Sequence, residues 1–96
     1  MALGVIATIT VREGKNAEFE KLFAELTAQV LANEPGALLY ALHRSNTDAQ
    51  VYKVLEQYAS MDDVKAHGQT DYFKEAGVKM GPLVTAAPVI ELLDVV

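Results

Sequence analysis

His67 is the residue of this chain best placed to do chemistry, because it falls where a helix is expected to present apolar side chains. Ser60 followed by Asp63 is close to a capping box and predicts that a helix begins here. Met61 and Val64 mark the inward face of this helix, and His67 lies on the same face. An imidazole titrates near neutral pH, so one that points into the protein is a candidate acid or base.

Two aromatic residues follow His67 at a short distance along the chain. Thr70 predicts the start of a second helix, whose first turn contains Tyr72 and Phe73. Both rings can wall the space around His67 and orient an aromatic ligand. The alternatives are ordinary core packing for the rings and, for His67, a structural histidine that donates to a backbone carbonyl near its helix end.

The strand that precedes these helices contributes two more polar groups. Glu56 and Tyr58 are two residues apart, so they share one face of the strand. A glutamate on a half-buried face usually pairs with another group, and Arg44 and Lys53 are the candidate partners. We therefore expect Glu56 to have a structural pairing.

Composition excludes several classes of protein. The chain has 96 residues, 51% of them hydrophobic and 22% charged, which predicts one globular domain over residues 1–96. A net charge of −5 with scattered basic residues argues against a nucleic-acid partner. No apolar run approaches the roughly 18 residues of a membrane span, and the N-terminus lacks signal-peptide features. We therefore expect a cytoplasmic protein with no membrane partner.

The sequence also predicts neither a metal site nor a bound cofactor. It contains no cysteine, and His43 and His67 lack the HxH or HExxH spacing of metal ligands. It contains no GxGxxG, P-loop or GxSxG motif, which argues against nucleotide-binding and serine-hydrolase sites. Nothing in the chain indicates a flavin or a nicotinamide.

Hydrophobic periodicity and turn residues predict the elements that must position these groups. Apolar residues repeat at helical spacing over residues 16–33, and Pro35 and Gly36 end that helix. The runs that predict strands are residues 3–12, 37–44, 50–58 and 89–96. The order βαββαβ, with two short helices in the second helical position, indicates an α+β ferredoxin-like antiparallel sheet with helices on one face.

The predicted strands are apolar on both faces, which a sheet covered on one side does not require. Val5 and Ile6 point to opposite faces of the first strand. In the second strand Tyr40 and His43 do so, and at most one of these two can reach a cavity under the helices. One layer of helices covers one face only, so we expect the other to pack on the sheet of a second copy.

A longer pattern runs through the whole chain. A strand ending E-x-Y precedes a capped short helix and the run A-H-x-x-T-x-Y-F, and the flanking segments read VREGKNAEFEKLF, EPGALLYALHRS and VIELLDVV. The motif residues are Glu56, Tyr58, Ala66, His67, Thr70, Tyr72 and Phe73. In their order and spacing these segments resemble the antibiotic biosynthesis monooxygenase domain family of small quinol-monooxygenase-like proteins.

The resemblance implies a homodimeric α+β barrel with one pocket per subunit between the sheet and the helices. It also implies a cofactor-independent monooxygenase that oxidises a small phenolic, quinol or polyketide-like aromatic substrate with O2. In that scheme His67 is the catalytic residue and takes the phenolic proton. Tyr72 and Phe73 hold the substrate ring, and the other expected substrate-binding residues are Tyr58, Met61 and Glu56.

Two other functions stay open, and a third is disfavoured. Haem-degrading relatives resemble one another in an asparagine on the first strand, a tryptophan at the end of the third and a histidine after it; this chain lacks the asparagine and the tryptophan, which argues against haem chemistry. An isomerase of small hydroxyketone phosphates would need a basic pocket, and only Lys65, Lys74 and Lys79 lie near His67 in the sequence. The alternative from another class is a non-catalytic dimeric protein that binds a small apolar metabolite, in which His67 would be replaceable.

Overall fold

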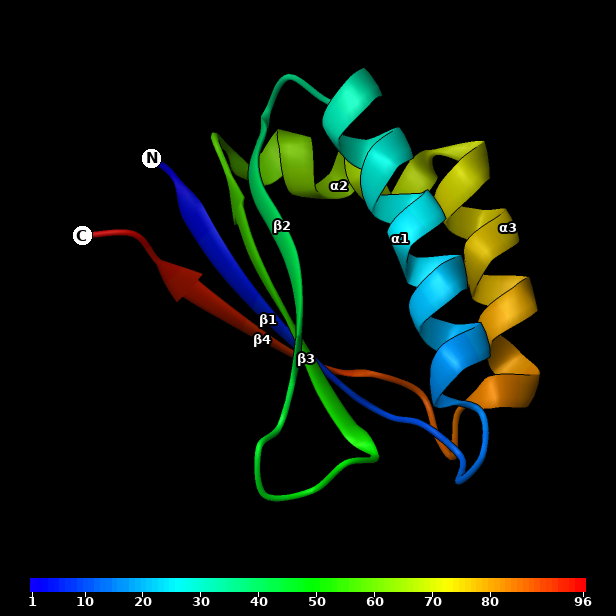
Figure 1. Cartoon of the computed structure of the whole chain (residues 1–96). Helices are drawn as coiled ribbons and strands as arrows, with labels where there is room; N and C mark the ends of the chain where they lie inside the picture. Colours follow the sequence, from blue (N-terminus) through cyan, green and yellow to red (C-terminus); the bar gives the residue numbers. More distant parts are fainter.

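The structure, a computed structural model, describes residues 1–96 and confirms the predicted order of elements (Figure 1). These are β1 (Leu3–Thr10), α1 (Asn16–Asn33), β2 (Ala37–Arg44), β3 (Val51–Tyr58), α2 (Met61–Gln69), α3 (Asp71–Met80) and β4 (Val89–Asp94). A 3₁₀ turn at Gly81–Leu83 follows α3. α1 has the predicted bounds, whereas β1 ends early because Val11 forms only an isolated bridge, with Val84. None of the helices combines the length and the apolar character that crossing a membrane requires.

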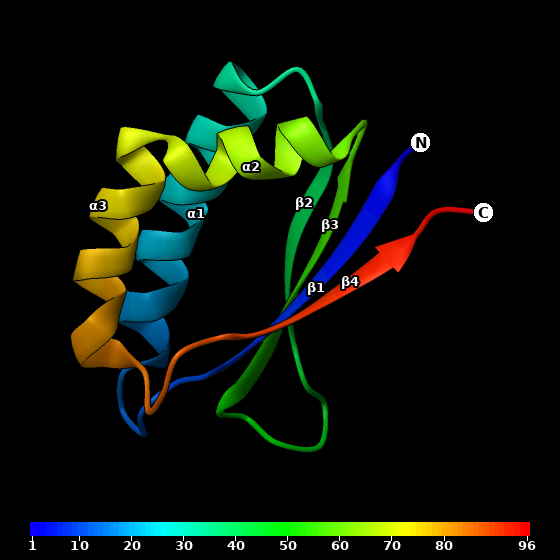
Figure 2. The same ribbon diagram turned by 180° about the vertical axis from the view of Figure 1, so that it is seen from behind.

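The four strands form one antiparallel sheet in the order β2–β3–β1–β4. Figures 1 and 2 show that α1, α2 and α3 all lie on one side of this sheet. The two chain ends lie close together, since Leu3 pairs with Asp94. β4 is an edge strand that the helices leave uncovered, so all of its residues are exposed. This is the ferredoxin-like α+β fold that the sequence predicts.

The apolar face of α1 forms the centre of the core. Its buried residues are Phe19, Phe23, Leu26 and Val30. The ring of Phe19 packs on Tyr52 of β3, with centroids 4.9 Å apart, and the ring of Phe23 stacks on Tyr40 of β2 at 5.6 Å. Burying each phenylalanine contributes about 1.5–3 kcal/mol, so α1 is held firmly against the sheet. The C-terminal end of α1 therefore has a defined position relative to the sheet.

The outer face of the sheet has no helix over it. This agrees with the prediction that one layer of helices covers only one of the two faces. Ile6 and Leu55 are cross-strand neighbours at the centre of this face, and both are only partly buried. Leu39 of β2 and Leu93 of β4 lie toward its edges, and 39% and 41% of their surfaces are exposed. Lys53 of β3 and Glu91 of β4 lie on the same face, so the uncovered face is apolar at its centre and carries charged residues around it.

Two hydroxyl caps define α2, the helix that carries His67. Ser60 Oγ accepts a hydrogen bond from the Asp63 N–H at 3.2 Å, which confirms the predicted helix start. Thr70 Oγ1 accepts from the Phe73 N–H at 3.4 Å and donates to the His67 carbonyl at 2.9 Å. Thr70 thus begins α3, as predicted, and ties that helix to the last turn of α2.

Replacing Ser60 by alanine is expected to lower the free energy of unfolding by about 1 kcal/mol, because the first turn of α2 loses its cap. Urea denaturation followed by circular dichroism measures this loss. Ser60→Thr keeps the capping oxygen and should unfold close to the wild type. Equal stability of the alanine and threonine variants would show that the cap does not hold α2.

Candidate active site

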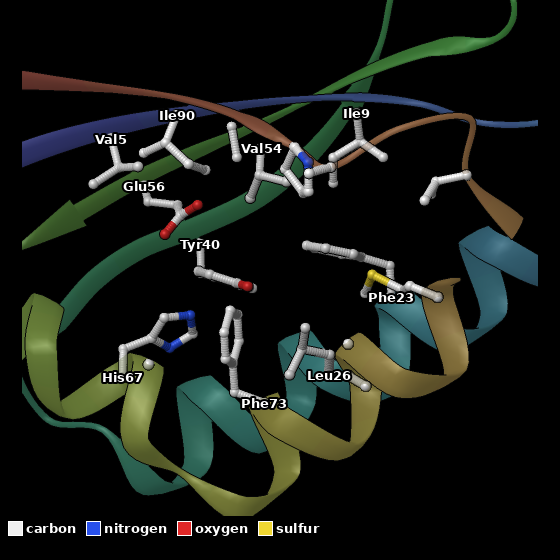
Figure 3. A pocket seen from close by; sticks show the side chains of 18 of the residues that line it. Val5, Ile9, Phe23, Leu26, Tyr40, Val54, Glu56, His67, Phe73 and Ile90 are labelled. Atoms are coloured by element: carbon white, nitrogen blue, oxygen red, sulfur yellow. The ribbon is translucent and has the colours of Figure 1, made fainter. Parts of the chain in front are cut away.

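A cavity of about 690 Å³ lies between the inner face of the sheet and the helices. Its walls are mainly apolar and include Val5, Ile9, Phe23, Leu26 and Val54 (Figure 3). The cavity extends to the β4 edge, where Ile90 and Leu92 face it. More than half of the surface of each of these two residues is exposed, at 57% and 53%, because no helix covers β4. The cavity can therefore take an apolar molecule and is open at this edge.

His67 projects from α2 into one end of this cavity (Figure 3). It is buried, with 6% of its surface exposed. Its ring is tilted against three aromatic rings, with centroid distances of 4.6 Å to Phe73, 5.2 Å to Tyr40 and 5.5 Å to Tyr58. The imidazole thus sits in an aromatic enclosure that fixes its position.

Glu34 is the polar partner of His67. The Nδ1 atom of His67 lies 3.0 Å and 3.1 Å from the two carboxylate oxygens of Glu34. The hydroxyl of Tyr72 donates a hydrogen bond to one of these oxygens. Burial and this bond to Glu34 raise the pKa of Tyr72 to about 12, so the phenol keeps its proton at neutral pH. The three side chains form one connected network behind the cavity wall.

Sequence reasoning misses Glu34 as a site residue, because the run Glu34-Pro35-Gly36 predicts only the end of a helix. Glu34 is the C-cap of α1, and its N–H still bonds to the Val30 carbonyl. A carboxylate at the C-terminal end of a helix opposes the helix dipole. Such a local conflict often marks a residue kept for another purpose, and it is the signal that could have pointed to Glu34.

Glu56 and Tyr58 line the same end of the cavity from β3, where Glu56 faces the space near Tyr40 (Figure 3). The hydroxyl of Tyr58 donates to Glu56 Oε1 at 2.7 Å. The predicted partners of Glu56 were wrong: Arg44 lies 3.7 Å from Glu20, and Lys53 is exposed on the opposite face of β3. Burial raises the pKa of Glu56, and the bond from Tyr58 only partly offsets this effect.

Replacing Glu56 by glutamine is expected to stabilise the protein increasingly as the pH rises. The pKa of Glu56 is raised by folding, so stability is lost as the pH rises from the unfolded value, about 4.3, through the folded value. Glutamine keeps an oxygen for Tyr58 but carries no charge to desolvate. Urea denaturation at about pH 4 and pH 8 measures the change, with the exposed Glu25→Gln as the control. If Glu56→Gln and the wild type differ in free energy of unfolding by the same amount at both pH values, the expected cost of the buried carboxylate is contradicted.

The structure brings four of the predicted site residues together on the cavity wall: His67, Phe73, Glu56 and Tyr58. It does not place Tyr72 there, because its hydroxyl contacts Glu34 behind the wall. The catalytic and substrate-binding roles of these five residues stay predictions.

Met61 was wrongly predicted to face inward. It lies in the first turn of α2, 39% exposed and away from the cavity. Six residues at about 100° each turn Met61 about 120° away from His67, so the two cannot share a narrow face. The choice that the sequence left open in β2 is settled, since Tyr40 is buried in the cavity wall and His43 is exposed.

The charged groups around the cavity bear on the kind of molecule it can hold. Arg12 is the one basic side chain of Lys or Arg type in the lining, and the lysines near His67 in the sequence do not line it. No group of three or more histidine, cysteine, aspartate or glutamate side chains is arranged to hold a metal ion. A cavity with apolar walls and a few polar groups is suited to a largely apolar small molecule.

Comparisons with known proteins agree with this fold. The chain is similar, with 61% identity and a TM-score of 0.96, to a protein from Caulobacter crescentus CB15 whose name assigns it provisionally to the antibiotic biosynthesis monooxygenases; the match covers 99% of this chain and 90% of that one. A Pseudomonas aeruginosa structure matches with 26% identity and a TM-score of 0.88, over 99% of this chain and 94% of that one. A conserved protein from Methanosarcina mazei Go1, with 23% identity and a TM-score of 0.91 over 96% and 90% of the two chains, shares the fold. No curated protein matches.

The sequence model of one family also matches most of the chain. Its description is antibiotic biosynthesis monooxygenase, and the match spans residues 2–78. This range includes both Glu34 and His67, and with them the whole of the network behind the cavity wall. The chain belongs to the antibiotic biosynthesis monooxygenase family.

Proposed function

We propose that this protein is a monooxygenase that oxidises a small phenol or quinol with O2 and without a cofactor. The observation that carries the proposal is His67, an imidazole on the wall of a 690 Å³ apolar cavity. Its Nδ1 atom is engaged by Glu34, so Nε2 is the nitrogen left for a ligand. A positioned imidazole in an otherwise apolar space is suited to removing a phenolic proton.

The protein's part in the reaction is to ionise and hold the substrate. His67 takes the phenolic proton, and the resulting phenolate is a far better electron donor than the phenol. Phe73 and Tyr58, which flank His67, hold the ring of the substrate beside it. The apolar walls limit access of water to the reactive intermediates.

The substrate supplies all the electrons in this scheme. The phenolate passes one electron to O2. The radical pair then combines to form a carbon–oxygen bond at the ring carbon ortho to the phenolic oxygen. The proton held by His67 passes to the peroxide oxygen. Loss of the proton on that ring carbon then breaks the O–O bond, leaving a new C=O group and one molecule of water. A hydroquinone and O2 thus yield a hydroxyquinone and water.

An aerobic screen of quinols and polyphenols, followed with an oxygen electrode, tests this proposal. Enzyme-dependent oxygen uptake with at least one of these compounds is the expected result. If aromatic compounds bind in the cavity and none is oxidised, the protein is a binding protein instead. A phosphate-bearing substrate for an isomerase is disfavoured, because Arg12 alone supplies a fixed positive charge at the cavity.

We also propose that the protein works as a homodimer whose subunits pack through their outer sheet faces. Support comes from the apolar face left uncovered around Ile6 and Leu55 and from the barrel that the family resemblance implies. Covering this face removes a large apolar surface from water.

A further inference from the structure

We propose that Glu34 and Tyr72 are positioning residues that set the tautomer of His67. In the neutral ring they keep the proton on Nδ1 and leave the lone pair on Nε2, the nitrogen available to the cavity. The part that this plays in turnover rests on the proposed function. The tautomer itself does not, because it is a property of the protein without substrate.

The distances around Nδ1 carry this inference. Nδ1 lies 3.0 Å from one oxygen of Glu34 and 3.1 Å from the other, so the two oxygens share one donor. An ionised carboxylate can only accept hydrogen bonds. A bare lone pair on Nδ1 would face the carboxylate lone pairs and be repelled, whereas an N–H pointing between the two oxygens satisfies both.

Tyr72 holds the carboxylate in the orientation that this contact needs. Its hydroxyl donates to Oε2 of Glu34, so that oxygen receives a second hydrogen bond. The side chain of Glu34 is 12% exposed and that of His67 is 8% exposed, so water competes little with these bonds. Glu34 also stands at the fixed end of α1, and Tyr72 stands in the first turn of α3. Three separate helices therefore hold one ring in one orientation.

The same contact stabilises the imidazolium that forms when His67 takes a proton. A carboxylate 3 Å from the ring attracts the positive charge, and it does so most effectively where water is excluded. Without Glu34 the ring could rotate or take its other tautomer, with the proton on Nε2. That tautomer presents a donor to the substrate hydroxyl and cannot act as a base.

Nitrogen NMR of the ¹⁵N-histidine-labelled protein without substrate tests the tautomer directly. The chain contains only two histidines, so in the His43→Gln variant all of the histidine signals come from His67. At a pH where the ring is neutral, we expect a pyrrole-type signal for Nδ1 and a pyridine-type signal for Nε2. A pyridine-type Nδ1 would overturn the inference, whatever the protein oxidises.

Variants of the network then link the tautomer to turnover. In Glu34→Ala we expect His67 to shift toward the Nε2–H form and kcat to fall by roughly 10²-fold with little change in KM. Tyr72→Phe should lower kcat by a smaller factor, about tenfold. The control is Glu25→Gln, an exposed glutamate of the same helix, which should leave both measurements unchanged. If Glu34→Ala does not fold, Glu34→Gln keeps the size without the charge and should also lower kcat.

The outcomes separate this inference from the proposed function. If no phenol is oxidised but His67 has the expected tautomer and loses it in Glu34→Ala, the positioning role stands and the proposed reaction fails. If oxidation depends on His67 and the Glu34 variants keep the wild-type tautomer and kcat, the proposed function stands and the positioning role is refuted.

Discussion

Replacement of His67 by alanine is expected to lower kcat on a quinol substrate by roughly 10²- to 10⁴-fold, the range for loss of a positioned proton-transfer group. The reason is that no other side chain in the lining combines a free nitrogen lone pair with a place beside Phe73 and Tyr58. Oxygen uptake measured over a range of substrate concentrations gives kcat and KM separately. Circular dichroism shows whether the variant has folded.

Two further variants serve as controls for this prediction. His67→Gln retains a side-chain amide that can donate to Glu34, so it avoids leaving that carboxylate without a partner, yet it cannot act as a base. His43→Ala removes the exposed histidine of β2 and should keep full activity. If His67→Gln oxidises the quinol as fast as the wild type, the imidazole is structural, and the proton is removed by another group or is lost from the substrate unaided.

Replacement of Leu55 by aspartate is expected to weaken the proposed dimer by roughly 10²- to 10⁴-fold in Kd. Leu55 lies at the centre of the outer sheet face, paired with Ile6 on β1 and Ala41 on β2. Burial of one leucine contributes about 1.5–3 kcal/mol, and a twofold-symmetric interface loses that contribution twice. Sedimentation velocity over a range of protein concentrations measures the change.

The matched control for the dimer is Val78→Asp. Val78 is an apolar residue of α3 with 79% of its surface exposed, and it lies on the helical side of the molecule. Its replacement should leave the dimer intact if the sheets form the interface. A wild-type protein that is a folded monomer at micromolar concentration would contradict the proposed assembly, as would a dimer that only Val78→Asp dissociates.

Local signals explain which parts of the fold could be predicted. The bounds of α1 follow from its apolar periodicity and from Pro35-Gly36, and the starts of α2 and α3 follow from the capping hydroxyls of Ser60 and Thr70. The end of β1 could not be predicted, because pairing with two neighbouring strands, and not the residue type of Val11, decides where the strand stops.

Long-range contacts explain what was missed in the site. The helical face of His67 could be predicted from its own helix, but its partner Glu34 lies 33 residues away on another element. Tyr72 was expected to line the cavity because it lies beside Phe73 in the sequence. Adjacent residues of a helix point about 100° apart, so when Phe73 faces the cavity Tyr72 faces Glu34.

In the proposed reaction one oxygen atom of O2 is added to a phenolic ring whose proton His67 removes. Turnover of a quinol under ¹⁸O₂, followed by mass spectrometry of the product, tests it most directly. We expect each product molecule to gain one ¹⁸O atom, at a rate that falls with the His67→Ala substitution. A quinone without ¹⁸O, formed together with hydrogen peroxide, would show simple oxidation of the quinol and contradict monooxygenation.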